Sequence, residues 1–172
     1  RHTRLVSDWS SDVCSSYLSA SKYLNQIESC IKKYNVGEIA SICGRYWIMD
    51  RNLLWDRTEK AYSNLTDPDI QVTNFSPKDY IEISYAKNIT DEFIEPIRMS
   101  ENYLKDGDSL ICFNFRPDRA RQIVQSLSDN EFSDFERKNY PNLDFVTFTQ
   151  YDPNFPVKVA FPPESLNNFI GQ

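Results

Sequence analysis

Apolar residues recur every three to four positions in several parts of the chain, and this spacing predicts helices. In residues 21–34 they fall on one helical face, and Asn35 follows as a stop signal. The same spacing predicts helices over 53–65 and 77–87 and a fourth that begins at Pro117. The apolar face of this fourth helix is formed by Ala120, Ile123, Val124 and Leu127.

Short apolar or alternating runs between these helices predict strands. Residues 38–43 and 110–115 are apolar runs bounded by turn residues, and residues 144–151 alternate in character. Helices that alternate with strands in this way are typical of an α/β fold. If the strands over 38–43 and 110–115 are parallel members of one sheet, their carboxyl ends meet at one edge.

The two ends of the chain differ from this pattern. Residues 1–18 are crowded with serine and lack a helical or strand period. They resemble translated adapter sequence that contaminates assembled reads, so we interpret them as an artefactual or disordered tail. Residues 155–163 are apolar and broken by prolines, as expected of a segment that crosses to another domain.

Segment 114–122 contains three arginines within six residues. Arg116 and Arg119 stand three residues apart at the amino end of the predicted fourth helix. A helix start offers unpaired N–H groups and positive potential, and guanidinium groups add charge-assisted donors. This segment is therefore a candidate site for a phosphate or carboxylate.

A second arginine segment follows the strand predicted over 38–43. Arg45 and Arg51 would leave the same sheet edge as the first pair, so four guanidinium groups would converge on one small anion. The alternative is that these arginines are solvated or paired with nearby carboxylates, of which Asp50 and Asp118 are the obvious ones.

Several neighbouring residues have simpler structural interpretations. We expect Arg57 and Arg121 to be surface or salt-bridge residues. Tyr46, Trp47 and Met49 are more typical of a core than of a ligand pocket.

Composition narrows the possible functions. The chain has 172 residues, 40% of them hydrophobic, with a formal net charge of −6 and a pI near 4.8. An acidic chain argues against nucleic-acid or membrane-surface partners, and no apolar run is long enough for a membrane span, so we expect a cytoplasmic location.

The only histidine is His2 and no C-x-x-C pair occurs, so we expect no metal site in this chain. A G-x-S-x-G nucleophile elbow is also missing from the sequence.

Several motifs resemble those of the cofactor-independent phosphoglycerate mutases. Residues 44–51, GRYWIMDR, and the run that follows them to Tyr62 are similar to the longest motif of that family. Residues 90–93, TDEF, and 114–122, NFRPDRARQ, resemble later motifs in the same order. The similarity covers about residues 19–172.

The resemblance implies a two-domain glycolytic enzyme that interconverts 3-phosphoglycerate and 2-phosphoglycerate through a phosphoserine. An alkaline-phosphatase-like domain holds two manganese ions and the serine. An inserted domain, a three-layer αβα sandwich with a mainly parallel sheet, binds the substrate. Residues 19–160 would be most of the inserted domain, and residues 161–172 would begin the return to the missing domain.

By the same resemblance, Arg45, Arg51, Arg116 and Arg119 are the substrate-binding residues. Catalytic and metal-binding residues would lie outside this chain, so we expect the fragment to be inactive alone and its intact parent to be a monomer. The family's D-G-R-D substrate motif should stand just before Ser19, where the foreign-looking tail stands instead.

Two other functions are compatible with these residues. The chain could be a free-standing anion-binding or interaction domain, in which arginines capture a ligand without catalysis. It could also belong to a related metal-dependent phosphomutase that acts on another sugar phosphate. The flanking reading frame would separate the first from the mutase, because the mutase requires a serine and a metal-binding set there.

Overall fold

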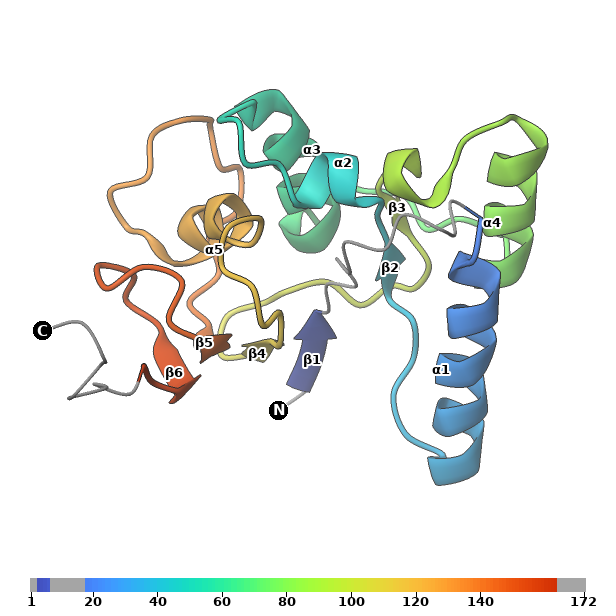
Figure 1. Ribbon diagram of the computed structural model, residues 1–172, viewed down its shortest axis with the longest axis horizontal. Helices are drawn as coiled ribbons and strands as arrows, with labels where there is room; N and C mark the ends of the chain where they lie inside the picture. Colours follow the sequence, from blue (N-terminus) through green and yellow to red (C-terminus); the bar gives the residue numbers. More distant parts are fainter. Residues whose placement is uncertain (1–2, 7–17, 164–172) are drawn as a thin grey trace, which may run out of the picture.

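The computed structural model describes residues 3–6 and 18–163. Helices and strands alternate along much of this length, as shown by colour in Figure 1. The elements are β1 (Thr3–Val6), α1 (Ala20–Tyr34), β2 (Ser41–Ile42), α2 (Arg45–Ile48), α3 (Trp55–Thr66), α4 (Pro77–Ala86), the 3-10 turn η1 (Asp91–Phe93), β3 (Ile97–Arg98), β4 (Ser109–Cys112), α5 (Arg121–Ser128), β5 (Asp144–Thr149) and β6 (Lys158–Phe161).

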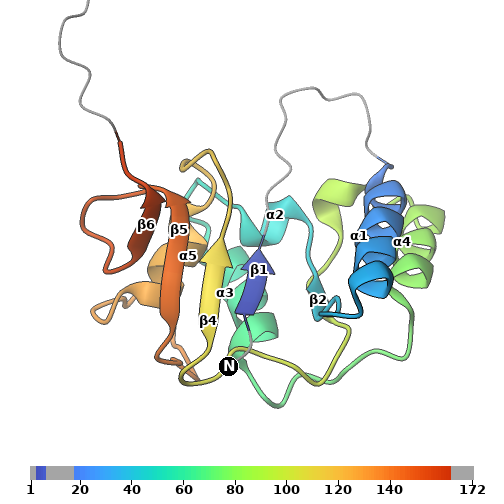
Figure 2. The same cartoon turned by 90° about the horizontal axis from the view of Figure 1, so that it is seen from below.

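The larger sheet is parallel throughout and has the strand order β1-β4-β5-β6. Helices α3 and α5 lie behind it when the sheet faces the viewer in Figure 2. The predicted α/β fold with a mainly parallel sheet is confirmed. Together α3 and α5 form one of the helical layers expected of a three-layer sandwich.

The main core lies between this sheet and α5. Leu110 of β4 stands opposite Phe145 of β5 in the register, and both side chains are buried. The face of α5 predicted to be apolar is also buried, which confirms the spacing argument. Beyond β5, the Tyr151 hydroxyl donates to the backbone oxygen of Asn114 at 2.6 Å and closes the core near the end of β4.

Strand β2 corrects one prediction. It does not join the sheet of β4 but pairs antiparallel with β3 in a separate two-stranded sheet. The apolar run over 38–43 shortens to a two-residue strand, and an apolar run alone does not specify its partner. The shared sheet edge on which the convergence of the arginines was predicted is therefore absent from the described residues.

Other boundaries also differ. Helix α5 begins at Arg121, because residues 117–120 form a turn closed by the Ala120 N–H on the Pro117 carbonyl at 3.1 Å. Strand β6 lies in the proline-broken segment that was expected to leave the domain, since backbone groups alone make a ladder.

The structure describes only part of the tail predicted over residues 1–18. Thr3–Val6 forms strand β1 beside β4, although no strand was predicted there. The rest of the predicted tail up to residue 17, and residues 164–172, lie outside the described residues.

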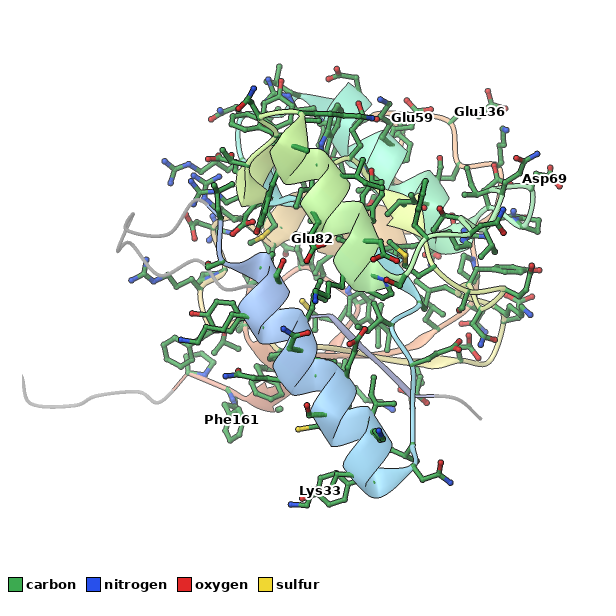
Figure 3. All side chains as sticks on the ribbon, turned by 90° about the vertical axis from the view of Figure 1, so that its right-hand side faces the viewer. Lys33, Glu59, Asp69, Glu82, Glu136 and Phe161 are labelled. Carbon is green, nitrogen blue, oxygen red and sulfur yellow. The ribbon has the colours of Figure 1, made fainter. Side chains whose placement is uncertain are left out.

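The helices predicted over 21–34, 53–65 and 77–87 are confirmed as α1, α3 and α4. Helices α1 and α4 pack together at one end of the molecule and face the viewer in Figure 3, where Lys33 marks the outer end of α1. Among the described helices, none combines the length and apolar character that a membrane span requires.

Candidate functional site

The two arginine segments lie side by side even though their strands belong to different sheets. Arg51 Nη1 donates to Asp118 Oδ2 at 3.1 Å, and Arg119 Nη1 donates to the Met49 carbonyl at 3.3 Å. Both bonds cross between the loop after α2 and the turn before α5. The structure thus brings the segments that carry Arg51 and Arg119 together by a different route from the one predicted.

Arg45 and Arg116 take no part in these two bonds. Arg45 begins α2, one helical turn before Met49, and its Nη2 is 3.0 Å from Glu92 Oε2. Arg116 is exposed on the loop that leaves β4, three residues before Arg119. Each of the four arginines stands on a loop, a turn or a helix start, where a long cationic side chain can reach a ligand.

Asp50 shapes the loop that carries Arg51. Its side chain is buried, and Oδ2 accepts from the N–H groups of Asn52 and Leu54 at 2.9 and 3.0 Å. Its Oδ1 accepts from Arg57 Nη1 at 3.2 Å. The alternative in which an arginine pairs with a nearby carboxylate holds for Arg51 and Asp118. Asp50 is not that partner, because its carboxylate turns the backbone into α3 and binds Arg57.

The structural interpretations of the neighbouring residues largely hold. Arg57 is a salt-bridge residue, and its guanidinium carbon lies 3.8 Å from the centre of the Tyr46 ring. Arg121 Nε donates to the Tyr151 carbonyl at 2.8 Å. Met49 is buried, as a core residue would be, whereas Tyr46 and Trp47 are half-buried.

Gln122 was not singled out from the sequence but joins the two segments. It is buried, its Oε1 accepts from Leu53 N at 3.1 Å, and its Nε2 donates to Thr58 Oγ1 at 3.2 Å. Gln122 stands beside the apolar stripe of α5 and not within it, so helical periodicity gives no sign of its burial. Glu92 was also missed as a partner of Arg45, although the TDEF run drew attention to its segment.

A cavity of about 630 Å³ opens beside Arg51 and Arg121. Arg51, Asp118 and Gln122, which join the two segments, form part of its lining. Asp129, Glu131 and Asp152 also line it, so its lining combines the guanidinium groups of Arg51 and Arg121 with four carboxylates. Arg45, Arg116 and Arg119 are not among the described residues that line this cavity.

Cys43 is held as a neutral thiol beside the start of α2. Burial raises the pKa of the Cys43 thiol, which directly precedes Gly44, to about 12, so the thiol stays protonated near neutral pH. Within residues 3–6 and 18–163, no group of three or more His, Cys, Asp or Glu side chains is arranged to hold a metal ion. The arrangement offers guanidinium groups to an anion.

Comparisons with known proteins agree with the motifs. Residues 15–153 match the family described as BPG-independent PGAM N-terminus. The 2,3-bisphosphoglycerate-independent phosphoglycerate mutase of Prochlorococcus marinus subsp. pastoris is 70% identical over 154 residues, and that of Prochlorococcus marinus strain MIT 9313 is 57% identical over 154 residues. Each alignment covers 90% of this chain and 28% of the relative.

A solved structure shares the fold. A phosphoglycerate mutase of Leishmania mexicana, crystallised at low cobalt concentration, superposes with a TM-score of 0.77 at 24% identity. That match covers 84% of this chain and 29% of the other. The chain therefore belongs to the BPG-independent phosphoglycerate mutase family and spans about 28% of the length of the curated relatives it matches.

Proposed function

We propose that the full-length protein containing this chain interconverts 3-phosphoglycerate and 2-phosphoglycerate, and that this chain binds the phosphoglycerate. The ligands would be the guanidinium groups of Arg45, Arg51, Arg116 and Arg119. Family membership and the name shared by the relatives support the reaction. The observation that carries the assignment to these residues is the pair of bonds, Arg51 to Asp118 and Arg119 to Met49, that joins the two arginine segments.

The charge and geometry of the arginines fit such a ligand. Phosphoglycerate carries a carboxylate and a phosphate, and guanidinium forks bind both through charge-assisted bonds worth roughly 1.5–3 kcal/mol each. Side chains Arg51 and Arg45 are 54% and 35% exposed, so an entering anion can reach them. Asp118 now holds Arg51, and in the complex an anionic group of the substrate would take over this contact.

We place the chemical steps outside this chain. The described residues do not form a metal centre, so two manganese ions and the serine of a phosphoserine mechanism would belong to the phosphatase-like part of the full-length protein. This chain would supply binding and orientation, and alone it would not turn over substrate. We further propose that the full-length protein is a monomer and acts in glycolysis in the cytoplasm.

The first test is the Arg116→Ala variant of the full-length enzyme. Loss of a guanidinium that holds the substrate should lower kcat/KM for 3-phosphoglycerate by on the order of a hundredfold, about 2.7 kcal/mol. Lys78→Ala, which removes an exposed positive charge from α4, serves as the matched control and should leave the rate unchanged. Wild-type kinetics in Arg116→Ala would show that Arg116 does not bind the substrate. Turnover by the 172-residue chain alone would disprove the proposal that the chemical steps take place outside this chain.

A further inference from the structure

Glu92 forms an ion pair with Arg45, and the segments that carry the two residues are also joined. Arg45 Nη2 and Glu92 Oε2 are 3.0 Å apart, and the two side chains are 35% and 28% exposed. An isolated surface pair of this kind contributes little to stability. Its effect here depends on how firmly the segments that carry the two residues are held together.

The backbones of α2 and η1 are in direct contact. Gly44 N donates to the Ile94 carbonyl at 2.8 Å, and a Cβ atom at Gly44 would lie 2.4 Å from the Glu92 carbonyl oxygen. Only glycine permits this approach. Trp47 Nε1 donates to the Phe93 carbonyl at 3.2 Å and adds a contact one turn further along α2.

The η1 turn that carries Glu92 is itself held in place by Asp91, the residue before Glu92. Asp91 Oδ2 accepts from the N–H groups of Ser19 and Ala20 at 2.9 and 3.1 Å, and Tyr85 donates its hydroxyl to Asp91 Oδ1. Asp91 thus caps the amino end of α1 and is tied to α4 at the same time. Two adjacent carboxylates therefore have separate roles, one anchoring η1 and the other binding Arg45.

We propose that Glu92 is a positioning residue for substrate binding, which acts by fixing the guanidinium of Arg45 in the orientation that receives an anionic group of the substrate. This inference rests on the proposed function of Arg45. A flexible arginine loses side-chain entropy when it binds a ligand, and a carboxylate that restrains it beforehand lowers that cost. The anchored η1 turn gives Glu92 a fixed place from which to do so.

Steady-state kinetics of the full-length enzyme test the proposal. Glu92→Ala should raise KM for 3-phosphoglycerate by on the order of tenfold with a much smaller change in kcat, because binding is impaired and the chemical groups are intact. Glu92→Asp should restore part of the affinity. Glu95→Gln removes an exposed charge from the same segment and should match the wild type.

A double-mutant cycle with Arg45→Ala separates this inference from the proposed function. If Glu92 acts through Arg45, Glu92→Ala combined with Arg45→Ala should bind no more weakly than Arg45→Ala alone. Independent, multiplying effects would overturn the positioning role, and so would a wild-type KM in Glu92→Ala when Arg45→Ala is impaired. A wild-type KM in Arg45→Ala would instead contradict the proposed function of Arg45. Because Glu92→Gln preserves size, it replaces Glu92→Ala in the cycle if the alanine variant does not fold.

Discussion

Gly44 shows how a single residue controls the geometry of the candidate site. Its φ of −71° and ψ of 152° are accessible to any residue, so backbone freedom does not explain the glycine. Space does, because a side chain there would meet the backbone of Glu92 and Ile94 at 2.4 and 2.7 Å. The missing side chain lets the η1 turn lie against the residue next to Arg45.

Gly44→Ala should therefore impair both stability and substrate affinity. The added methyl forces η1 away from α2, and overpacking of this kind costs about 1–3 kcal/mol. Urea unfolding of the 172-residue chain should show the lower free energy of unfolding, and the full-length enzyme should show a raised KM.

Gly37→Ala is the control for this substitution. Gly37 has a φ of +80°, and a Cβ atom added there would meet open space. Alanine at this position should therefore lower the free energy of unfolding by about 1–2 kcal/mol through backbone strain alone. The KM of that variant should equal that of the wild type. Equal stability of Gly44→Ala and the wild type would show that the contact between α2 and η1 relaxes without cost.

Among the elements, α3 has an unusual carboxyl end because a buried arginine from another element caps it. Arg98 of β3 is only 2% exposed, and its Nε and Nη1 donate to the carbonyls of Asn64 and Asp67 at 3.1 and 2.7 Å. These bonds satisfy carbonyls that a helix end leaves unpaired, and the positive charge complements the helix dipole. They also attach the small sheet of β2 and β3 to α3.

Arg98→Met should destabilise the chain severely. Methionine keeps much of the volume but leaves several buried carbonyls without donors, so a loss of at least about 3 kcal/mol is expected. Urea unfolding measures it, and Lys78→Met on the exposed side of α4 should change the free energy of unfolding by less than about 0.5 kcal/mol. A small effect of Arg98→Met would mean that water replaces the guanidinium at this helix end.

The predictability of the elements follows the range of the interactions that form them. Helices α1, α3 and α4 were predicted because amphipathic spacing and local stop signals lie within the segments themselves. The pairing of β2 with β3 was not predicted, because a short apolar run fits a parallel or an antiparallel neighbour equally well. Arg98 gave no signal of burial, because arginine is normally exposed and its acceptors are more than 30 residues away.

At the scale of the whole molecule, the candidate site was only partly predictable. The arginines stood out because charged clusters next to predicted turns are visible in the sequence, and the structure does bring the two arginine segments into contact. The supporting residues Gln122 and Glu92 were missed because their partners lie 69 and 47 residues away. Which carboxylate holds which arginine depends on the three-dimensional arrangement.

The whole chain should become less stable in alkali. Burial raises the pKa of Tyr62, and burial together with Asp91 raises that of Tyr85, each from 10.0 to about 12. These groups bind protons more tightly when folded, so their contribution is complete below pH 10 and is lost as the pH rises from 10 to about 12.

Urea unfolding across that pH range should show a falling free energy of unfolding, and tyrosinate absorbance should show late-titrating phenols that include Tyr62 and Tyr85. Tyr62→Phe and Tyr85→Phe together should flatten the decline. An unchanged slope in the double variant would assign the alkaline transition to other groups.

The bonds that join the two arginine segments have a consequence for how the molecule is made. They connect residues 67 to 70 positions apart, so a long loop must close before the cluster exists. During synthesis the ribosome releases α1, α3 and α4 well before the turn that carries Arg116 and Arg119, and domains generally fold as their segments emerge. A nascent chain would thus contain most of its helices while still lacking two of the four arginines proposed to bind the anion. Affinity for the anion would therefore be acquired late in folding. The anion would stabilise only those molecules in which the two distant segments are already in contact.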